Sequence, residues 1–300
     1  MRPHAFTKDN LINLKPEHDS FVGIDSDGCV FPTMEIKQKR CFHKLIVTHW
    51  RLEKIEKYVR ESAEFVNLYS IHRGQNRFLC LMLTIDLLRN RPQVLASKIE
   101  LPEFKSLRKL ADSGVPLSNF ELEKAAKNTG DEELASVLKW SNDVNAEVAK
   151  TVRNVAPFKW VRESFQEIRK NSDAICVSQT PTEALMREWE EHKLLGFVKI
   201  IAGQELGTKK EHIHLATDGR YKGDKIIMLG DAPADQRAAR ENHAHFYPIN
   251  PGHEEESWER FYKEAYKKFL DGSYGGEYEE RLIRKFKALL PSVPPWERKE

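Results

Sequence analysis

Short apolar runs alternate with amphipathic segments between about residues 155 and 250. The runs DAICVSQT, GFVKIIAGQ, DKIIMLGD and HAHFYPI have the length and apolar content of short strands. The segments between them, such as PTEALMREWEEHKL and APADQRAARENH, carry apolar residues at helical spacing. This alternation predicts parallel βαβ units, and hence an α/β core built on a Rossmann-like parallel sheet.

Another apolar run, at residues 20–25, lies near the N-terminus and ends at two carboxylates, Asp25 and Asp27. The pattern changes after it, because long charged segments with helical spacing replace the strand-like runs up to about residue 154. One such segment, SNFELEKAAKNTG, has a capping residue at its start and Gly130 at its end. A region of this length is too large for a loop and predicts an inserted all-α domain.

These patterns predict three regions along the chain. Residues 1–35 and 155–250 would form the Rossmann-like core, and residues 36–154 would form a helical domain inserted into it. Residues 251–300 are rich in aromatic side chains and predict two helices separated by DGSYGGEY. We expect this last region to be a helical extension that packs on the core.

Composition narrows the class of protein. The chain has 300 residues, of which 40% are hydrophobic and 31% charged, and its formal net charge is +2. This balance lacks the strong positive charge of a nucleic-acid-binding protein, so we expect no nucleic-acid partner. The four cysteines form no CxxC pair, and the N-terminal MRPHAFTKDN has no apolar core of a secretory signal. We therefore expect a cytoplasmic protein without membrane contact, as a monomer or a homodimer.

Polar side chains follow the predicted strands at the points where the strands end. Because the carboxyl ends of adjacent parallel strands meet at one edge of a sheet, several carboxylates would share a small space there. They can stay ionised together only with a cation among them, and hard oxygen ligands favour Mg²⁺. A lysine and a hydroxyl group beside them suit a phosphate group. The residues concerned are Asp25, Asp27, Ser178, Lys209, Asp231 and Asp235.

Two of these assignments have close competitors in the sequence. Thr180 lies two residues after Ser178, and the choice depends on where the strand ends. Lys210 follows Lys209 directly. The spacing to Ile213 favours Lys209, because a helix can then bury Ile213 while Lys209 faces the site.

The polar strand ends form an ordered set of motifs that resembles the haloacid dehalogenase (HAD) superfamily. The superfamily's DxDG motif is matched by DSDG at residues 25–28, and its strand-ending hydroxyl by the serine in ICVSQTP. Its lysine before a helix is matched in GTKKEHI, and its GDxxxD motif by the sequence LGDAPAD. The resemblance covers about residues 18–35 and 155–250, and the helical insert resembles the superfamily's C1-type cap.

The resemblance implies a mechanism. Asp25 would be the nucleophile that forms an aspartyl-phosphate, and Asp27 would be the general acid and then the general base. Ser178 and Lys209 would hold the phosphoryl oxygens. Mg²⁺ would be bound by the Asp25 carboxylate, the Asp27 main-chain carbonyl, Asp231 and Asp235.

The helical insert contains the polar segment IHRGQNRF, from which we predict three substrate-binding residues: Arg73, Asn76 and Arg77. A basic loop could bind an anionic or hydroxylated substrate. The competing interpretation is an ordinary helix start with solvated charges.

The sequence thus predicts a Mg²⁺-dependent phosphatase that hydrolyses a small phosphorylated metabolite. A second acid two residues after the nucleophile favours phosphate esters over carbon–halogen bonds, because an alkoxide leaving group needs a proton. The alternatives are a phosphomutase, a phosphonate hydrolase or a non-catalytic binding protein on the same scaffold.

Overall fold

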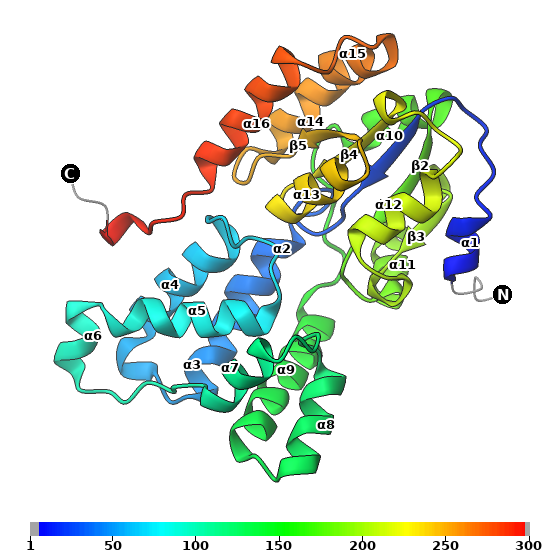
Figure 1. Ribbon diagram of the computed structural model, residues 1–300. Coiled ribbons are helices and arrows are strands. Elements are labelled where there is room, and N and C mark those ends of the chain that lie inside the picture. Colours follow the sequence, from blue (N-terminus) through cyan, green and yellow to red (C-terminus); the bar gives the residue numbers. More distant parts are fainter. Residues whose placement is uncertain (1–5, 298–300) are drawn as a thin grey trace. The chain divides into compact units, whose positions relative to one another are not determined.

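The chain divides into two compact units in a computed structural model that describes residues 6–297. The outermost ends of the predicted regions, residues 1–5 and 298–300, lie outside the described residues. Of the described residues, 6–34 and 154–290 form the core unit, and 35–153 and 291–297 form the helical unit (Figure 1).

The core unit is built on one five-stranded sheet, and all its strand pairs are parallel. The strands are β1 (Phe21–Ile24), β2 (Asp173–Val177), β3 (Ile200–Ala202), β4 (Ile226–Gly230) and β5 (His245–Pro248). Their order is β3-β2-β1-β4-β5, so the chain crosses from one side of β1 to the other between β3 and β4. The predicted Rossmann-like parallel sheet is confirmed. Its switch point, where such sheets bind ligands, lies at the carboxyl ends of β1 and β4.

Helices cover both faces of the sheet because its strands are buried on both sides. The core unit contains α1 (Lys8–Ile12), α10 (Val161–Asn171), α11 (Thr182–Glu191), α12 (Lys209–Thr217), α13 (Pro233–Glu241), α14 (Glu254–Arg260), α15 (Tyr266–Asp271) and α16 (Glu277–Leu289). Val22 and Ile24 pack with α10, α11, α14 and α15 on one face. Phe21 packs with α1, α12, α13 and α16 on the other face.

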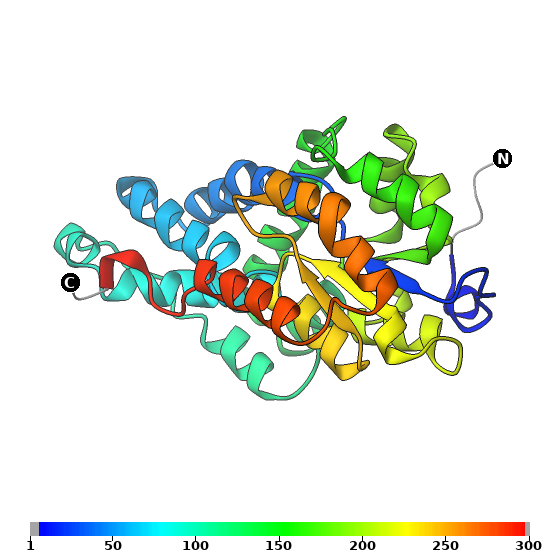
Figure 2. The ribbon, with the colours of Figure 1, turned by 90° about the horizontal axis from the view of Figure 1, so that it is seen from above.

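The edge strand β5 lies between helices of the C-terminal region. Phe246 packs against Phe286 of α16, and Tyr247 packs on the opposite face against Phe261, which follows α14. Figure 2 shows these orange and red helices beside the edge of the sheet. The predicted break between two C-terminal helical segments is confirmed, because residues 272–276 separate α15 from α16.

The helical unit contains no strand among its described residues. Its helices are α3 (His43–His49), α4 (Glu56–Leu68), α5 (Arg77–Arg89), α6 (Pro92–Ser97), α7 (Lys105–Asp112), α8 (Asn119–Thr129) and α9 (Glu132–Thr151). The short helix α2 (Thr33–Ile36) leads into it from the core unit. As expected, Ser118 caps the start of α8 by accepting a hydrogen bond from the Glu121 amide, and Gly130 ends the helix in a left-handed conformation.

Short 3₁₀ segments connect these elements: Glu53–Ile55, Leu195–Phe197, Gln204–Leu206, Gly223–Lys225 and Pro295–Glu297. Two π-helical segments, Lys37–Phe42 and Phe261–Ala265, were not predicted, because apolar spacing does not reveal one extra residue in a helical turn. Among the described helices, none is long and apolar enough to span a membrane.

The expectation that residues 251–300 pack on the core does not hold for the end of this region. From Pro291 onward the chain groups with the helical unit. The Trp296 ring lies 5.8 Å from the ring of Phe65, and the guanidinium of Arg91 lies 3.9 Å from the centre of the Trp296 ring. The main-chain carbonyl of Pro291 also accepts a hydrogen bond from the Ile71 amide. These aromatic and cationic contacts account for the different placement.

Candidate active site

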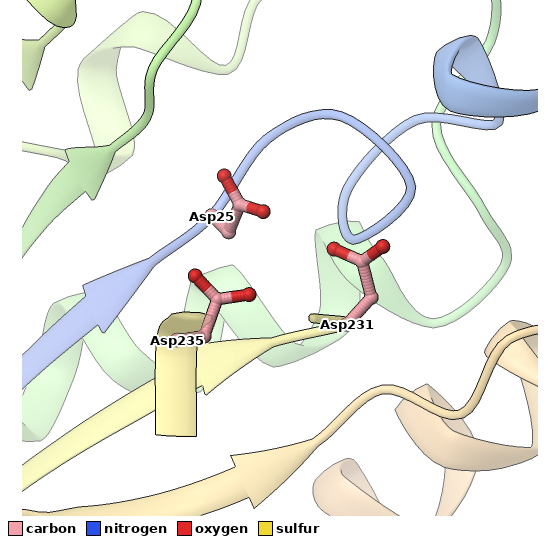
Figure 3. Close-up of side chains that lie close together, drawn as sticks. All are labelled: Asp25, Asp231 and Asp235. Atoms are coloured by element: carbon pink, nitrogen blue, oxygen red, sulfur yellow. The ribbon is translucent and has the colours of Figure 1, made fainter. Parts of the chain in front are cut away.

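Three buried carboxylates meet at the switch point of the sheet. Asp25 directly follows β1, Asp231 directly follows β4, and Asp235 lies in the first turn of α13. One carboxylate oxygen from each residue lies within 4.8 Å of the other two (Figure 3). Asp231 and Asp235 have no exposed surface, and Asp25 is 4% exposed. The predicted convergence of the two strand ends therefore produces a closely packed acidic cluster.

Lys209 joins this cluster from the start of α12. Its ammonium nitrogen lies 3.0 Å from the Asp25 Oδ2 atom and 2.6 Å from the Asp235 Oδ1 atom. Burial opposes the charged ammonium, but Asp235 and Asp25 outweigh this effect and raise the pKa of Lys209. The Lys209 side chain is therefore protonated and positively charged.

Burial and neighbouring carboxylates raise the pKa values of Asp25 and Asp235. Burial raises the pKa of Asp25 well above its ordinary value; Lys209 opposes this shift, and Asp235 and Asp231 add to it. Burial also raises the pKa of Asp235, with Lys209 again opposing and Asp231 adding. Burial and the neighbouring carboxylates thus disfavour the ionised forms of Asp25 and Asp235, and Lys209 favours them.

The acidic cluster fits a divalent metal ion. Its donors are carboxylate oxygens, which Mg²⁺ prefers, and the metal's charge would lower the cost of keeping them ionised together. Asp25, Asp231 and Asp235 are the residues that could hold it.

Gly230 allows Asp235 to reach the cluster. A Cβ atom at position 230 would lie 2.4 Å from the carboxylate of Asp235, so no larger residue fits there without a shift. Asp235 also accepts a hydrogen bond from the Ala232 amide, over 3.0 Å, at the start of its own helix. The turn between β4 and α13 therefore fixes the position of this carboxylate.

Asp27 is held by two hydroxyl groups of the core unit. Thr180 donates a hydrogen bond to the Oδ2 atom of Asp27 over 2.6 Å, and Thr33 donates one to the Oδ1 atom. The Asp27 side chain is nearly buried. Sequence reasoning missed Thr33, since no motif of the sequence marked it and its hydroxyl reaches Asp27 only after the chain has turned back.

The structure separates the roles of the two candidate hydroxyl residues after β2. Ser178 directly follows the strand, and its hydroxyl oxygen accepts a hydrogen bond from the Thr180 amide over 3.2 Å. Thr180 instead directs its hydroxyl at Asp27. The two lysines also differ, because Lys210 is exposed and pairs with Glu241, whereas Lys209 lies in the acidic cluster.

The three residues predicted to bind substrate make contacts inside the helical unit. Arg73 is buried and donates a hydrogen bond to the Leu68 carbonyl. Asn76 caps α5 by accepting a hydrogen bond from the Phe78 amide. Arg77 donates to the side chain of Asn145 over 2.7 Å. These contacts give all three residues a structural role, and substrate binding by them stays a prediction.

Comparisons with known proteins give distant structural similarity only. No protein-family model matches the sequence, and no curated protein matches it. A putative β-phosphoglucomutase from Bacteroides vulgatus has a similar structure, with 12% identity, a TM-score of 0.45, and coverage of 89% of this chain and 98% of that chain. A haloacid dehalogenase-like hydrolase from Streptococcus pneumoniae has 12% identity and a TM-score of 0.42, over 80% of this chain and 90% of that chain.

A further similar structure is a putative HAD hydrolase from Bacillus subtilis bound to magnesium, with 11% identity and a TM-score of 0.40 over 77% of this chain and 88% of that chain. The chain is therefore similar to HAD-like hydrolases, whose motifs its sequence resembles.

Proposed function

We propose that this chain is a Mg²⁺-dependent phosphohydrolase that cleaves the phosphate monoester of a small metabolite through a phosphoryl group carried on Asp25. The observation that supports it best is the buried cluster of Asp25, Asp231 and Asp235 with the Lys209 ammonium among them. A carboxylate held by two hydroxyl groups, Asp27, lies two residues after the nucleophile.

The three clustered carboxylates would hold the metal ion, together with the main-chain carbonyl of Asp27 as in the superfamily that the sequence resembles. When bound, Mg²⁺ supplies positive charge that offsets the negative charge of the phosphoryl oxygens. The Lys209 ammonium adds a second positive charge at the same place. The Ser178 hydroxyl accepts a hydrogen bond from the Thr180 amide, and its own hydrogen would be donated to a phosphoryl oxygen.

In the first chemical step, Asp25 is the nucleophile and Asp27 is the general acid. A carboxylate oxygen of Asp25 attacks phosphorus and forms a P–O bond, while the bond from phosphorus to the ester oxygen breaks. Asp27, in its protonated form, gives its proton to the departing ester oxygen. The products of this step are the free alcohol and an aspartyl-phosphate on Asp25.

The second step returns the enzyme to its starting state. Asp27, now ionised, takes a proton from a water molecule as the water oxygen attacks phosphorus. The bond between phosphorus and the Asp25 oxygen breaks, and inorganic phosphate leaves. Thr180 and Thr33 fix the direction of the Asp27 carboxylate through both of its oxygens.

Phosphate release from a panel of phosphorylated metabolites and one aryl phosphate tests the proposal. Release should require Mg²⁺, stop with a chelator, and fall roughly a thousandfold or more in Asp25→Asn. The control is Asp9→Asn, because Asp9 is an exposed residue of α1, outside the site. The proposal is contradicted if folded wild-type protein releases no phosphate from any ester, or if Asp25→Asn retains the activity.

A further inference from the structure

The loop of residues 25–31, which carries both proposed catalytic carboxylates, turns back tightly on itself. The amides of residues 29–31 lie 2.9 to 3.3 Å from the carbonyl oxygen of Ser26. Gly28 has a φ angle of +79°, in the left-handed region, and its amide donates a hydrogen bond to the Phe31 carbonyl over 2.8 Å. The conformation of this loop therefore determines where the two carboxylates point.

Two buried tryptophans contact this loop through their indole N–H groups. Trp189 of α11 donates a hydrogen bond to the Ser26 hydroxyl oxygen over 3.0 Å. Trp258 of α14 donates one to the main-chain carbonyl of Cys29 over 2.7 Å. Both indoles have no exposed surface. They hold the turn at two points, one on a side chain and one on the main chain.

The two tryptophans belong to one aromatic cluster in the core unit. Phe165 lies between them, stacked on Trp189 at 5.6 Å and edge-on to Trp258 at 5.9 Å. Phe261 also packs edge-on against Trp258, with ring centres 5.7 Å apart. This packing fixes the direction of the Trp258 N–H group, because the ring cannot turn within the cluster.

Trp258 is supplied by the C-terminal region, which lies outside the predicted βαβ pattern. The preceding residue, Ser257, is tied to the end of β5. Its carbonyl accepts a hydrogen bond from the Tyr247 hydroxyl over 2.6 Å, and its hydroxyl oxygen accepts one from the Asn250 amide over 3.0 Å. The sheet thus sets the position of α14 at the residue next to Trp258.

We propose that Trp258 is a positioning residue for the reaction, which holds the 25–31 loop in the conformation where Asp25 and Asp27 act. The C-terminal helices then form part of the catalytic scaffold. A buried main-chain carbonyl needs a donor, and the Trp258 indole supplies one to Cys29 within the loop itself. The kinetic consequence rests on the proposed phosphohydrolase function, whereas the ordering of the loop does not.

Trp258→Phe tests the proposal, since it removes the N–H donor and keeps an aromatic ring in the cluster. We expect kcat for phosphate release to fall about tenfold with KM within about twofold of wild type, because a loosened loop misplaces the reacting groups after substrate has bound. We also expect faster hydrogen exchange at the amides of residues 28–31, measured by mass spectrometry without substrate. Benzothienylalanine at position 258, which replaces the N–H with sulfur in a ring of the same shape, is the second variant.

Phe286→Leu is the matched control. It removes a buried aromatic ring on the opposite face of the sheet, where Phe286 packs against Phe246, so it should lower the melting temperature and leave loop exchange and kcat near wild-type values. Trp189→Phe should behave like Trp258→Phe, because its indole contacts Ser26 of the same loop.

The kinetic measurement and the hydrogen-exchange measurement test the phosphohydrolase function and the positioning role of Trp258 separately. If the Trp258 variants change only the melting temperature, with wild-type loop exchange and kcat, Trp258 has a packing role and the inference is overturned. If wild-type protein releases no phosphate, the proposed function fails, and the exchange arm alone decides. Faster exchange in the 28–31 segment then supports the positioning of the loop, and unchanged exchange refutes it.

Discussion

At the residue scale, the orientation of Asp27 depends on hydroxyl groups from two distant parts of the sequence. Thr33 and Thr180 each donate to a different oxygen of its carboxylate. A carboxylate held at both oxygens cannot rotate freely, so the direction in which it exchanges protons is set before substrate binds.

Thr180→Val should lower kcat for phosphate release by about tenfold and change KM little, because the carboxylate of Asp27 loses a hydroxyl donor that orients it. Steady-state kinetics on the best substrate measure this. Thr182→Val is the control, since the Thr182 hydroxyl bonds Glu205 over 2.7 Å rather than Asp27. Equal kcat values for Thr180→Val and wild type would show that the hydrogen bond does not orient Asp27.

His43 gives the folded protein a specific sensitivity to acid. Burial lowers the pKa of this side chain from 6.5 to about 3, and Arg60 and Lys39 add to the shift. The unfolded chain therefore binds a proton here below about pH 6.5 and the folded chain does not, so this stabilisation is complete above that pH and is lost as the pH falls.

His43→Asn should remove that part of the acid sensitivity. Between pH 7 and pH 5, the free energy of unfolding of wild type should fall by about 2 kcal/mol more than that of the variant. Urea denaturation at the two pH values measures the difference, with His253→Asn, at an exposed position, as control. Parallel pH profiles for wild type and His43→Asn would contradict the interpretation.

The sequence identified the site residues that directly follow strands. It did not identify the residues whose side chains hydrogen-bond to the 25–31 loop from other elements. Asp25 and Asp231 lie at the ends of apolar runs, and such ends can be recognised from the sequence alone. Thr33 and Trp258 contact the 25–31 loop from elements whose placement depends on tertiary packing. The local sequence of these two residues carries no sign of that contact.

At the element scale, the start of α12 determines where Lys209 lies. Thr208 and Glu211 form a capping box: the Thr208 hydroxyl oxygen accepts from the Glu211 amide over 3.2 Å, and Glu211 accepts from the Thr208 amide over 2.7 Å. Lys209 is the first residue of the helix, so its direction toward Asp25 follows from where this cap begins the helix.

Thr208→Ala should therefore affect both stability and catalysis. We expect the free energy of unfolding to fall by about 1 kcal/mol and phosphate release to fall several-fold, as Lys209 loses its fixed position. Ser118→Ala is the matched control, because Ser118 caps α8 in the helical unit and should lower stability similarly without reducing activity. Equal activity in the two variants would show that the cap does not position Lys209.

The elements themselves were largely predictable. The βαβ alternation and the helix caps are local patterns, and the strands and helices occur where those patterns indicate them. The two π-helical segments were not predictable, because an extra residue in a turn leaves apolar spacing almost unchanged.

At the scale of the whole molecule, the chain passes between the two units at residues 34–35, 153–154 and 290–291. The region boundaries expected from the change in pattern, at residues 35–36 and 154–155, lie one residue after the first two crossings. The sequence did not predict the third crossing, at residues 290–291. Trp296 lies in a region rich in aromatic residues, and nothing in the local sequence distinguishes it from the aromatic residues that pack on the core. Trp296 contacts Phe65 and Arg91 of the helical unit.

Ending the chain after Leu290 should destabilise the helical unit by about 2 kcal/mol, the scale of a buried aromatic and cation–π contact. Faster hydrogen exchange in α4 and α5, with unchanged exchange in β1 and β4, is the expected measurement. A chain that ends after Glu297 keeps Trp296 and serves as control. Wild-type exchange in α4 and α5 of the shorter chain would show that the terminal segment does not stabilise this unit.

The most direct test of the central claim is to locate the phosphoryl group during turnover. Protein mixed with its best substrate and Mg²⁺ is quenched in acid, digested and mapped by mass spectrometry. Asp25 should carry one phosphoryl group, which should be absent from Asp25→Asn. With the aryl phosphate, whose phenoxide leaves without a proton, this group should accumulate in Asp27→Asn, because water activation slows. Rapid phosphate release without any phosphoryl group on Asp25 in either wild type or Asp27→Asn would contradict the account.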